Sequence, residues 1–289
     1  MDNIKVGVVI LAWNHKKDTL ECLDSMLRSV EISPIIIVVD NGSTDGTLET
    51  IEMLNEKRVK VLRSEKNLGV SGGYNLGLSY CFNMNCDYIL ITNNDVLFDK
   101  FMLNELVKFA SKQTDVGIVI PKIYHYFMKN KIWMIGARWR KFPPTLKMIG
   151  YNENDSNKYK LPIQLEYVPS CCYLISRNVI DKIGYFDEGY FFYFDDWDYS
   201  LRVRNAGFSI WLNPAAIAWH KVSISTQKQP KPYIWWKQMG YSASRFYKKH
   251  CSKYEQLFGL SWLVIREFIK LHPIMAIGIL LGIVKERTK

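Results

Sequence analysis

An acidic cluster stands among aromatic residues in the segment FFYFDDWDYSLR at positions 191–202. Three carboxylates, Asp195, Asp196 and Asp198, fall within four positions. Carboxylates that lie close together beside apolar rings repel one another and lose solvation, and both effects raise a carboxyl pKa. A carboxylate whose pKa is raised toward neutrality can take a proton from a hydroxyl group. The cluster is therefore a candidate functional site.

Polar side chains also mark the ends of apolar runs in the first half of the chain. At the ends of the runs 5–12, 34–40 and 87–92 stand Asn14, Asp40, Asn41, Asn94 and Asp95. An acid at a strand end can receive the base or ribose of a nucleotide. A carboxylate with few charged neighbours can bind a divalent cation that bridges to a diphosphate. The alternatives are ordinary turn chemistry at Asp40 and a helix cap at Asp95.

A glycine-rich segment, NLGVSGGYNLG at 67–77, opens a predicted helix. Backbone amides at Gly69, Gly72 and Gly73, with Asn75 close by, are placed where they could hold a phosphate. The segment is not a dinucleotide fingerprint, which would follow the first strand. The alternative is a glycine-rich turn with close packing of the helix on a strand.

A single histidine, His220, ends the apolar run AAIAWH at 215–220. An isolated histidine is more often a structural residue than a ligand. Its place at the end of an apolar run matches the places of the polar residues above, and this favours a role in the same site.

The elements that must position these residues alternate along the chain. Apolar strands are predicted at 5–12, 34–40, 59–64, 87–92 and 116–121. Helices are predicted at 18–30, 71–83 and 98–111, and a further helix follows the turn NGSTDGT and ends at residue 56. This order predicts an α/β fold with a doubly wound, mainly parallel sheet covered by helices on both faces. In such sheets ligands bind at the carboxyl ends of the strands, where the polar residues fall.

The second half of the chain is less regular. Within 122–166 the stretches WRKFPP and NENDSN indicate loops. A strand is predicted over 167–176, a helix over 195–206, an extended segment over 208–213 and a short strand over 215–220. Asp18 and Asp195 are predicted N-caps of their helices.

The composition is that of a globular protein, with 48% hydrophobic and 23% charged residues. The six cysteines form no CxxC pair and lie in apolar contexts, which indicates buried thiols in a cytoplasmic protein. The N-terminus has neither a basic region nor a cleavage site and is predicted to enter a strand directly.

The C-terminal segment, residues 226–289, differs from the rest. The last 69 residues hold 13 Lys/Arg and 3 Asp/Glu, which accounts for the whole net charge of +10. The run 273–284 is uncharged but shorter than the about 20 residues that a membrane span requires. We expect helices over 230–249 and 254–270 that lie in the interface of an anionic membrane. The alternative is packing of this segment on the domain or in a dimer.

The motifs VVILAWN, VVDNGSTDGT, NLGVSGGYNLG, TNNDV, GYFDEGYFFYFDDWDYSLRVRNAGF and Trp-His occur in that order. The series resembles glycosyltransferase family 2, which has the GT-A fold. It is most similar to the branch that contains bacterial rhamnosyltransferases and galactofuranosyltransferases. The resemblance covers about residues 4–225 and implies a catalytic domain over 1–225, with a nucleotide-sugar half at about 1–120 and an acceptor half at about 121–225.

The resemblance implies a role for each residue on the donor side. Asp40 would hydrogen-bond the nucleobase, with Asn14 and Asn41 near the nucleoside. Asn93–Asp95 matches the family's DxD motif, and the asparagine in first place leaves Asp95 as the charged ligand of Mg²⁺ or Mn²⁺. His220 matches a histidine that completes the metal or diphosphate site.

The acidic cluster matches the acid–Asp motif of the family. Asp196 would be the catalytic base, and Asp195 replaces the more usual glutamate. Asp195 is the alternative base, because adjacent residues at a helix start point in different directions. Trp197, Asp198 and Arg202 would line or support the acceptor side, with Arg202 paired to an acid or a phosphate. The QxxRW motif of processive synthases is absent after residue 200, which disfavours a polysaccharide synthase.

The implied activity is inverting, metal-assisted transfer from a nucleoside-diphosphate sugar to a hydroxyl of a glycan or lipid-linked precursor of cell-surface polysaccharide. The favoured donors are dTDP-rhamnose and UDP-sugars. The implied location is the cytoplasmic side, peripheral on the inner face of the plasma membrane, without a nucleic-acid partner. One alternative is a sugar nucleotidyltransferase, although WNHKKD stands where its basic glycine-rich loop would be. The other is a non-catalytic protein that binds nucleic acid or membrane through its basic tail.

Overall fold

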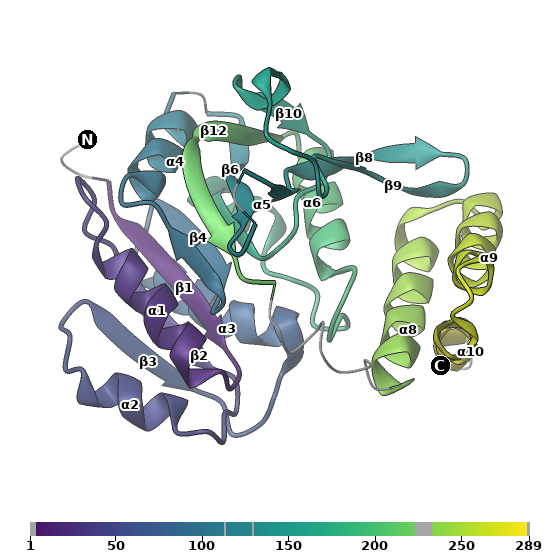
Figure 1. The fold of residues 1–289 in the computed structure, drawn as a ribbon, viewed down its shortest axis with the longest axis horizontal. Helices are drawn as coiled ribbons and strands as arrows, with labels where there is room; N and C mark the ends of the chain where they lie inside the picture. The colour runs from purple at the N-terminus through teal and green to yellow at the C-terminus, as the bar shows by residue number, and fades with distance from the viewer. Residues whose placement is uncertain (1–3, 113, 129, 223–232, 288–289) are drawn as a thin grey trace.

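The computed structural model describes residues 4–112, 114–128, 130–222 and 233–287. Within these residues, ten strands form one mixed sheet at the centre of the molecule, with helices on both faces (Figure 1). Along the sheet the order is β10 (Ile163–Leu165), β12 (Ser209–His220), β6 (Val116–His125), β11 (Cys172–Ser176), β4 (Tyr88–Asn93), β1 (Val6–Ala12), β2 (Ile35–Asp40) and β3 (Val59–Arg63). Two short strands extend it, β5 (Val96–Phe98) beside β12 and β7 (Ile132–Met134) beside β6.

Among the described residues of 16–205, six α-helices connect the strands. They are α1 (Lys16–Leu27), α2 (Thr47–Met53), α3 (Gly69–Asn83), α4 (Met102–Ala110), α5 (Arg177–Ile183) and α6 (Asp195–Asn205), with a 3-10 turn at Asn157–Tyr159. Strand β1 is buried along its whole length, and β2 is buried from its second residue on. Continuous runs of Val and Ile suit strands that are covered on both faces, which is why these runs predicted the sheet.

The predicted sheet is confirmed as mainly parallel around β1, but it is not parallel throughout. Strand β11 runs antiparallel to both β4 and β6. A fully buried strand presents the same apolar pattern in either direction, so the sequence did not reveal this reversal.

Three other predictions about local structure were wrong. Helix α1 begins at Lys16 after His15, so Asp18 lies in the first turn and not at the N-cap. Helix α6 begins at Asp195, and its N-cap is Phe194, whose φ of 63° is left-handed. Part of the region predicted as loops forms a hairpin of β8 (Gly136–Lys141) and β9 (Pro144–Ile149).

One further difference concerns the end of the sheet. The two extended segments predicted at 208–213 and 215–220 are one strand, β12, with an irregular register between Asn213 and Ile217. The strand therefore carries His220 at its end without an intervening loop.

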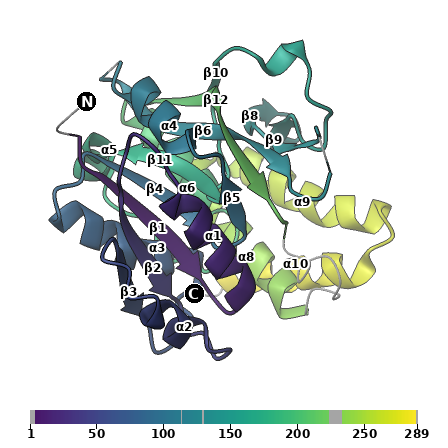
Figure 2. The same cartoon turned by 60° about the vertical axis from the view of Figure 1, so that its left-hand side comes forward.

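The C-terminal helices are α8 (Tyr233–His250), α9 (Lys253–Ile269) and α10 (Pro273–Arg287). Figures 1 and 2 show them stacked beside the sheet, with α8 on the inner side. Helices α8 and α10 approach closely at Gly240, where the lack of a side chain leaves room: a Cβ there would lie 1.9 Å from the carbonyl oxygen of Ile279. No described helix has the length and apolar character needed to cross a membrane.

The C-terminal helices share an apolar core with the loop before α6. Tyr190 and Phe194 of that loop pack with Phe246, Tyr247 and Leu260. The C-terminal helices therefore pack on the loop before α6, as the alternative of packing on the domain expected. The boundary predicted near residue 225 lies outside the described residues.

The described cysteines are all free, as predicted, and only Cys251 is partly exposed.

Candidate active site

The carboxyl ends of β1, β2 and β4 meet at one edge of the sheet. Ala12 lies beside Asp40, and Leu11 lies beside Asn93 in the parallel register. The polar residues that follow these strands are thereby brought together, as the parallel arrangement predicted.

Hydrogen bonds join the loops at this edge. The backbone N–H of Asn14 donates to Ser43 Oγ at 2.8 Å, and Thr44 N–H donates to Asn14 Oδ1 at 2.8 Å. The side-chain amide of Asn94 donates to the carbonyl oxygen of Asn14 at 3.1 Å and to Thr19 Oγ1 at 2.8 Å. Asn14 and Asn94 therefore fix the shape of this edge.

Asp40 carries a carboxylate oxygen that lacks a partner. The residue is only 1% exposed, and Ser43 N–H donates to its Oδ1 at 3.1 Å. Its Oδ2 is buried and accepts no hydrogen bond from any described residue. Because a buried carboxylate oxygen is costly to leave unpaired, Oδ2 is suited to accept a hydrogen bond from a ligand.

Asn41 holds the glycine-rich segment in place. Its side-chain amide donates to Asn67 Oδ1 at 3.1 Å and to the carbonyl oxygen of Gly69 at 3.0 Å, and its Oδ1 accepts from Leu68 N–H at 2.9 Å. The predicted proximity of Asn41 to a nucleoside remains a prediction.

Close packing within the protein accounts for the glycines of this segment. A Cβ at Gly69 would lie 2.3 Å from the carbonyl oxygen of Phe191, and one at Gly73 would lie 2.4 Å from Leu11 Cδ1. A Cβ at Gly72 would lie 2.9 Å from Leu68 Cβ. These contacts fit the alternative of a close turn, and contact with a phosphate remains a prediction.

Asn75 is engaged by the loop that leads to the acidic helix. Its side chain exchanges hydrogen bonds of 3.0 Å with the backbone of Phe186 and donates to Glu188 Oε1 at 2.9 Å. These contacts give Asn75 a structural role, and a contact with the nucleotide sugar stays a prediction.

The prospective metal ligands come from neighbouring strands. Strand β5 pairs with β12 so that Val96 lies opposite His220, which brings Asp95 beside the imidazole. His220 Nε2 lies 3.1 Å from Asp95 Oδ1, and both residues are buried. The indole of Trp133 packs edge-on against the imidazole at 4.5 Å, and the buried His220 Nδ1 has no hydrogen-bond partner among the described residues.

A carboxylate and an imidazole are suitable donors for a divalent cation. Within the described ranges, no third His, Cys, Asp or Glu joins them in a group that could hold a metal ion. The remaining coordination positions would have to come from a ligand such as a diphosphate, or from water.

The acidic pair lies at the first turn of α6. Asp195 is 4% exposed and accepts a hydrogen bond from Ser170 Oγ at 3.1 Å. Asp196 is partly exposed; its Oδ2 accepts from the Tyr167 hydroxyl at 2.5 Å, and its Oδ1 accepts from Trp197 N–H at 3.0 Å. The left-handed residues Tyr193 and Phe194 turn the chain into this helix.

Burial raises the pKa of both acids. The pKa of Asp195 rises to about 8, because of burial first and repulsion by Asp196 second. Burial raises the pKa of Asp196 to about 6, although the Tyr167 hydroxyl opposes the shift by stabilising the charged form. With these pKa values the two carboxyl groups share one proton near neutral pH. The upward direction of the Asp196 pKa shift is the one that the aromatic setting of the cluster predicted.

A pocket of about 370 Å³ is lined by Trp197, the residue after Asp196, while Asp196 itself is not among the lining residues. Tyr167, which donates to Asp196, forms part of its wall together with Trp139, Trp197 and Phe246. The polar groups of the pocket include Lys141, Glu166, Arg204 and Glu255. Sequence reasoning found only Trp197, because the others come from separate segments without a motif.

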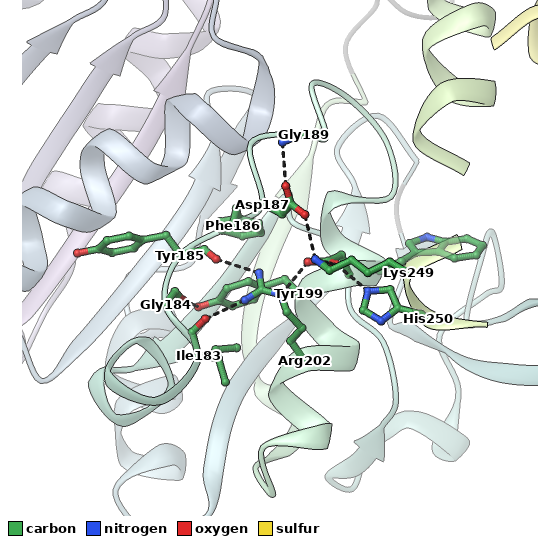
Figure 3. A network of polar contacts seen from close by, with 12 residues as sticks. Ile183, Gly184, Tyr185, Phe186, Asp187, Gly189, Tyr199, Arg202, Lys249 and His250 are labelled. Atoms are coloured by element: carbon green, nitrogen blue, oxygen red, sulfur yellow. Dashed lines mark hydrogen bonds and ion pairs between the residues drawn. The ribbon is translucent and has the colours of Figure 1, made fainter. Parts of the chain in front are cut away.

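Asp198 belongs to a different environment, which Arg202, Lys249 and His250 form around it; Figure 3 labels these three residues. It is fully buried and accepts hydrogen bonds from Arg202 Nε at 2.7 Å, Lys249 Nζ at 2.8 Å and His250 Nε2 at 2.7 Å. Burial by itself would raise the pKa of Asp198, but these bonds outweigh it and hold the pKa well below its usual range. The predicted pairing with Arg202 is confirmed, and Lys249 and His250 of α8 were not foreseen.

Arg202 uses its other nitrogens within the protein. It donates to the carbonyl oxygens of Ile183 at 3.0 Å and Tyr185 at 2.8 Å (Figure 3). Asp198 and Arg202 thus anchor α6 to the preceding loop and to α8. Direct contact of these two residues with an acceptor is not supported by this arrangement.

Comparison with known sequences defines the class. The sequence model of glycosyl transferase family 2 matches residues 7–184, and the chain belongs to this family. It is 24% identical over 249 residues to the N-acetylglucosaminyl-diphospho-decaprenol L-rhamnosyltransferase of Mycobacterium tuberculosis, a match that covers 78% of this chain and 79% of that protein. It is 30% identical over 134 residues to glycosyltransferase GlyG of Streptococcus pneumoniae, covering 42% of this chain and 40% of the relative.

Solved structures show the same fold. The mannosyltransferase PcManGT of Pyrobaculum calidifontis, in complex with GDP-Man and Mn²⁺, superposes with a TM-score of 0.60 at 14% identity, covering 98% of this chain and 87% of that one. GalNAc-T7 with UDP, GalNAc and Mn²⁺ superposes with a TM-score of 0.66 at 14% identity over 96% of this chain. The chain spans about half (55%) of GalNAc-T7. The predicted GT-A fold and the rhamnosyltransferase-like branch of the family are confirmed.

Proposed function

We propose that this glycosyltransferase moves one sugar from a nucleoside-diphosphate sugar to a hydroxyl group of a glycan or lipid-linked glycan precursor, with inversion at the anomeric carbon. The observation that carries the proposal is the acidic pair at the start of α6. Asp196 is partly exposed, has a pKa raised toward neutrality, and accepts a hydrogen bond from Tyr167, which lines a pocket with aromatic walls.

On the donor side, Asp40 is proposed to bind the nucleobase. Its buried, unpartnered Oδ2 would accept the ring N–H of a pyrimidine. Uracil, thymine and guanine all present a ring N–H, so this pairing alone does not select the base. A UDP-sugar and dTDP-rhamnose are the donors proposed. The similarity to the mycobacterial rhamnosyltransferase points to the second of these.

Asp95 and His220 are proposed to hold a divalent cation, as Mg²⁺ or Mn²⁺. Imidazole is a better ligand for Mn²⁺ than for Mg²⁺, so this donor pair favours Mn²⁺. A bound cation would neutralise charge on the leaving diphosphate. Asp95 and His220 are buried and orient each other, so their positions at this edge are defined before a ligand binds.

In the transfer step, Asp196 is proposed to take the proton of the acceptor hydroxyl as that oxygen attacks the anomeric carbon. The bond between the anomeric carbon and the diphosphate oxygen breaks in the same displacement, and one displacement inverts the centre. The Tyr167 hydroxyl and Trp197 N–H hold the carboxylate in position. Asp195 keeps the shared proton, so the pair carries one negative charge.

The acceptor is proposed to occupy the pocket that Tyr167 and Trp197 line. Aromatic side chains such as Trp139 and Trp197 offer flat apolar surfaces against which a sugar ring can stack, and the surrounding acids and bases offer hydrogen bonds. A lipid-linked acceptor in the synthesis of cell-surface polysaccharide would place the enzyme on the cytoplasmic side, at the inner face of the plasma membrane.

The test is a donor screen followed by product analysis. Thermal unfolding is measured with dTDP-, UDP- and GDP-sugars, each with Mn²⁺ or Mg²⁺, because a ligand that binds the folded state raises the melting temperature. The proposal expects the largest shift with a pyrimidine-nucleotide sugar and Mn²⁺, and release of a nucleoside diphosphate during turnover. Release of pyrophosphate would instead identify a nucleotidyltransferase.

A further inference from the structure

The two outermost helices each expose an apolar stripe. On α9 the exposed apolar side chains recur at helical spacing: Tyr254, Leu257, Phe258, Ile265 and Ile269. The opposite side of α9 is covered, with Leu260 and Leu263 in the core shared with α8. The stripe therefore lies on the side of α9 that the protein leaves open.

Helix α10 repeats the pattern on its own outer side. Its exposed residues are Ile274, Ile277, Leu280, Leu281 and Val284. Between the helices Leu271 is 86% exposed, and it is flanked by Ile269 at 68% and Ile274 at 67%. The exposed apolar residues from 254 to 284 are called here the C-terminal apolar face. A soluble monomer rarely exposes so continuous an apolar surface without a partner.

The charges beside this face have one sign. Among the described side chains of residues 253–285, the exposed groups that carry a full charge at neutral pH are lysines, and they include Lys253 and Lys270. Lys270 Nζ also lies 3.9 Å from Oε1 of the buried Glu267. The two acids are withdrawn. Glu255 is partly buried and hydrogen-bonded to Ser252, and Glu267 is 3% exposed and bonded to Arg266. A partner that fits this face therefore has an apolar interior for the exposed side chains and negative charges at its surface for the lysines.

A bilayer with anionic head groups has this chemistry, since lysines lie at the head groups while apolar side chains enter the boundary of the acyl chains. A second copy of the same face would place lysines near lysines, which is unfavourable. The 15 residues of α10 measure about 22 Å at 1.5 Å per residue, less than the about 30 Å of a hydrocarbon core. The helices thus suit the plane of the interface and not a span across it.

We infer that the C-terminal apolar face docks the enzyme on an anionic lipid bilayer, with α9 and α10 lying in the interface and Leu271 at their deepest turn. This deepens the location given under the proposed function and rests on it only for the link to a lipid-linked acceptor. Lys249 and His250 of α8 bind Asp198 on the catalytic helix, so the docked helices and Asp196 form one connected unit.

The experiment is co-sedimentation of the full chain with vesicles, one set of neutral phosphatidylcholine and one set containing phosphatidylglycerol. The double variant L271D/I274D is compared with the control double variant M53D/L161D, whose parent residues are 82% and 75% exposed on other parts of the molecule. We expect the wild type and the control to bind the anionic vesicles, and L271D/I274D to bind them at least about 100-fold more weakly, about tenfold for each side chain.

A charge variant separates the two components of the binding. The substitutions K270E and K285E are each expected to weaken binding to anionic vesicles by about fivefold or more, with little change on neutral vesicles. Failure of the wild type to bind anionic vesicles, or equal losses in both double variants, would overturn the inference. A wild-type dimer that L271D/I274D converts to a monomer, without vesicle binding, would assign the face to a second copy.

Vesicle binding requires no sugar transfer, so the two proposals fail separately. A protein that binds vesicles but transfers no sugar would contradict the proposed reaction and leave the docking face in place.

Discussion

Asp196 and Asp198 are two residues apart on one helix, yet they lie in opposite electrostatic environments. Asp196, with Asp195, is surrounded by aromatic rings and hydroxyl groups, and burial raises the pKa of the pair. Asp198 is more deeply buried than Asp196, but three basic side chains reach it and hold its pKa low. Burial alone therefore does not decide the state of an acid, because the partners that reach it determine whether it is suited to proton transfer or to structural support.

The largest effect on stability is expected at Asp198. The substitution Asp198→Asn removes the buried negative charge that Arg202, Lys249 and His250 share, and the loss of these charge-assisted hydrogen bonds should lower the free energy of unfolding by about 1.5–3 kcal/mol. Chemical denaturation measures this change. The matched control is Asp24→Asn, which removes another Asp–Arg pair at i,i+4, with an N–O distance of 2.7 Å but an exposed position. That control should lose less than about 1 kcal/mol, and an equal loss in both variants would contradict the role of Asp198 as a buried anchor.

The second prediction concerns the transfer rate of Tyr167→Phe. The Tyr167 hydroxyl stabilises the charged form of Asp196, so its removal should raise the pKa of Asp196 further. A hydrogen bond to a charged group contributes about 1.5–3 kcal/mol, which corresponds to an upward shift of about one to two pH units in the acidic limb of the rate profile. Tyr151→Phe, at an exposed tyrosine, is the control. If the acidic limb of the rate profile is unchanged in Tyr167→Phe, the ionisation that the profile reports does not belong to Asp196.

The third prediction uses the opposite signs of the two pKa shifts. Asp198 has a lowered pKa in the folded state, so its ionised form stabilises the fold at pH values above the pKa of an ordinary aspartate. This contribution to the free energy of unfolding is lost as the pH falls below that ordinary pKa toward the lowered pKa of the folded state. Asp195 has a raised pKa, so its contribution is present at low pH and is lost as the pH rises from about 4 through about 8.

Asp195→Asn mimics the protonated acid and should therefore remove a decline in stability between pH 4 and 8, a slope of at most about 1.4 kcal/mol per pH unit. Unfolding free energies measured across this range test the sign. A steeper decline in the variant than in the wild type would show that Asp195 is not the acid with the raised pKa.

Much of the fold was predictable because buried strands have a simple signature. The apolar runs of β1, β2 and β4 and the polar residues at their ends predicted the sheet and its binding edge. The direction of β11 was not predictable, because its apolar run reads alike both ways. The hairpin β8–β9 was missed because its sequence, GARWRKFPPTLKMI, contains two adjacent prolines and lacks a clear alternation of polar and apolar residues.

The site was predictable where its residues stand in motifs and not where they come from distant segments. Asp40, Asp95, Asp196 and His220 lie where the sequence placed them, with roles that remain proposals. Lys249 and His250, by contrast, lie 51 and 52 residues beyond Asp198. A basic helix end gives no indication of which acid it will reach, so the anchoring role of Asp198 became visible only in the folded chain.

The central claim is that Asp196 is the base of a sugar transfer while Asp198 supports the helix that carries it. The most direct measurement is the transfer rate of Asp196→Asn, taken together with its donor affinity and its free energy of unfolding. We expect the rate to fall by about 10²–10⁴-fold, as for loss of a general base, while donor affinity and stability stay near those of the wild type. A variant that retains more than a tenth of the wild-type rate would contradict this assignment.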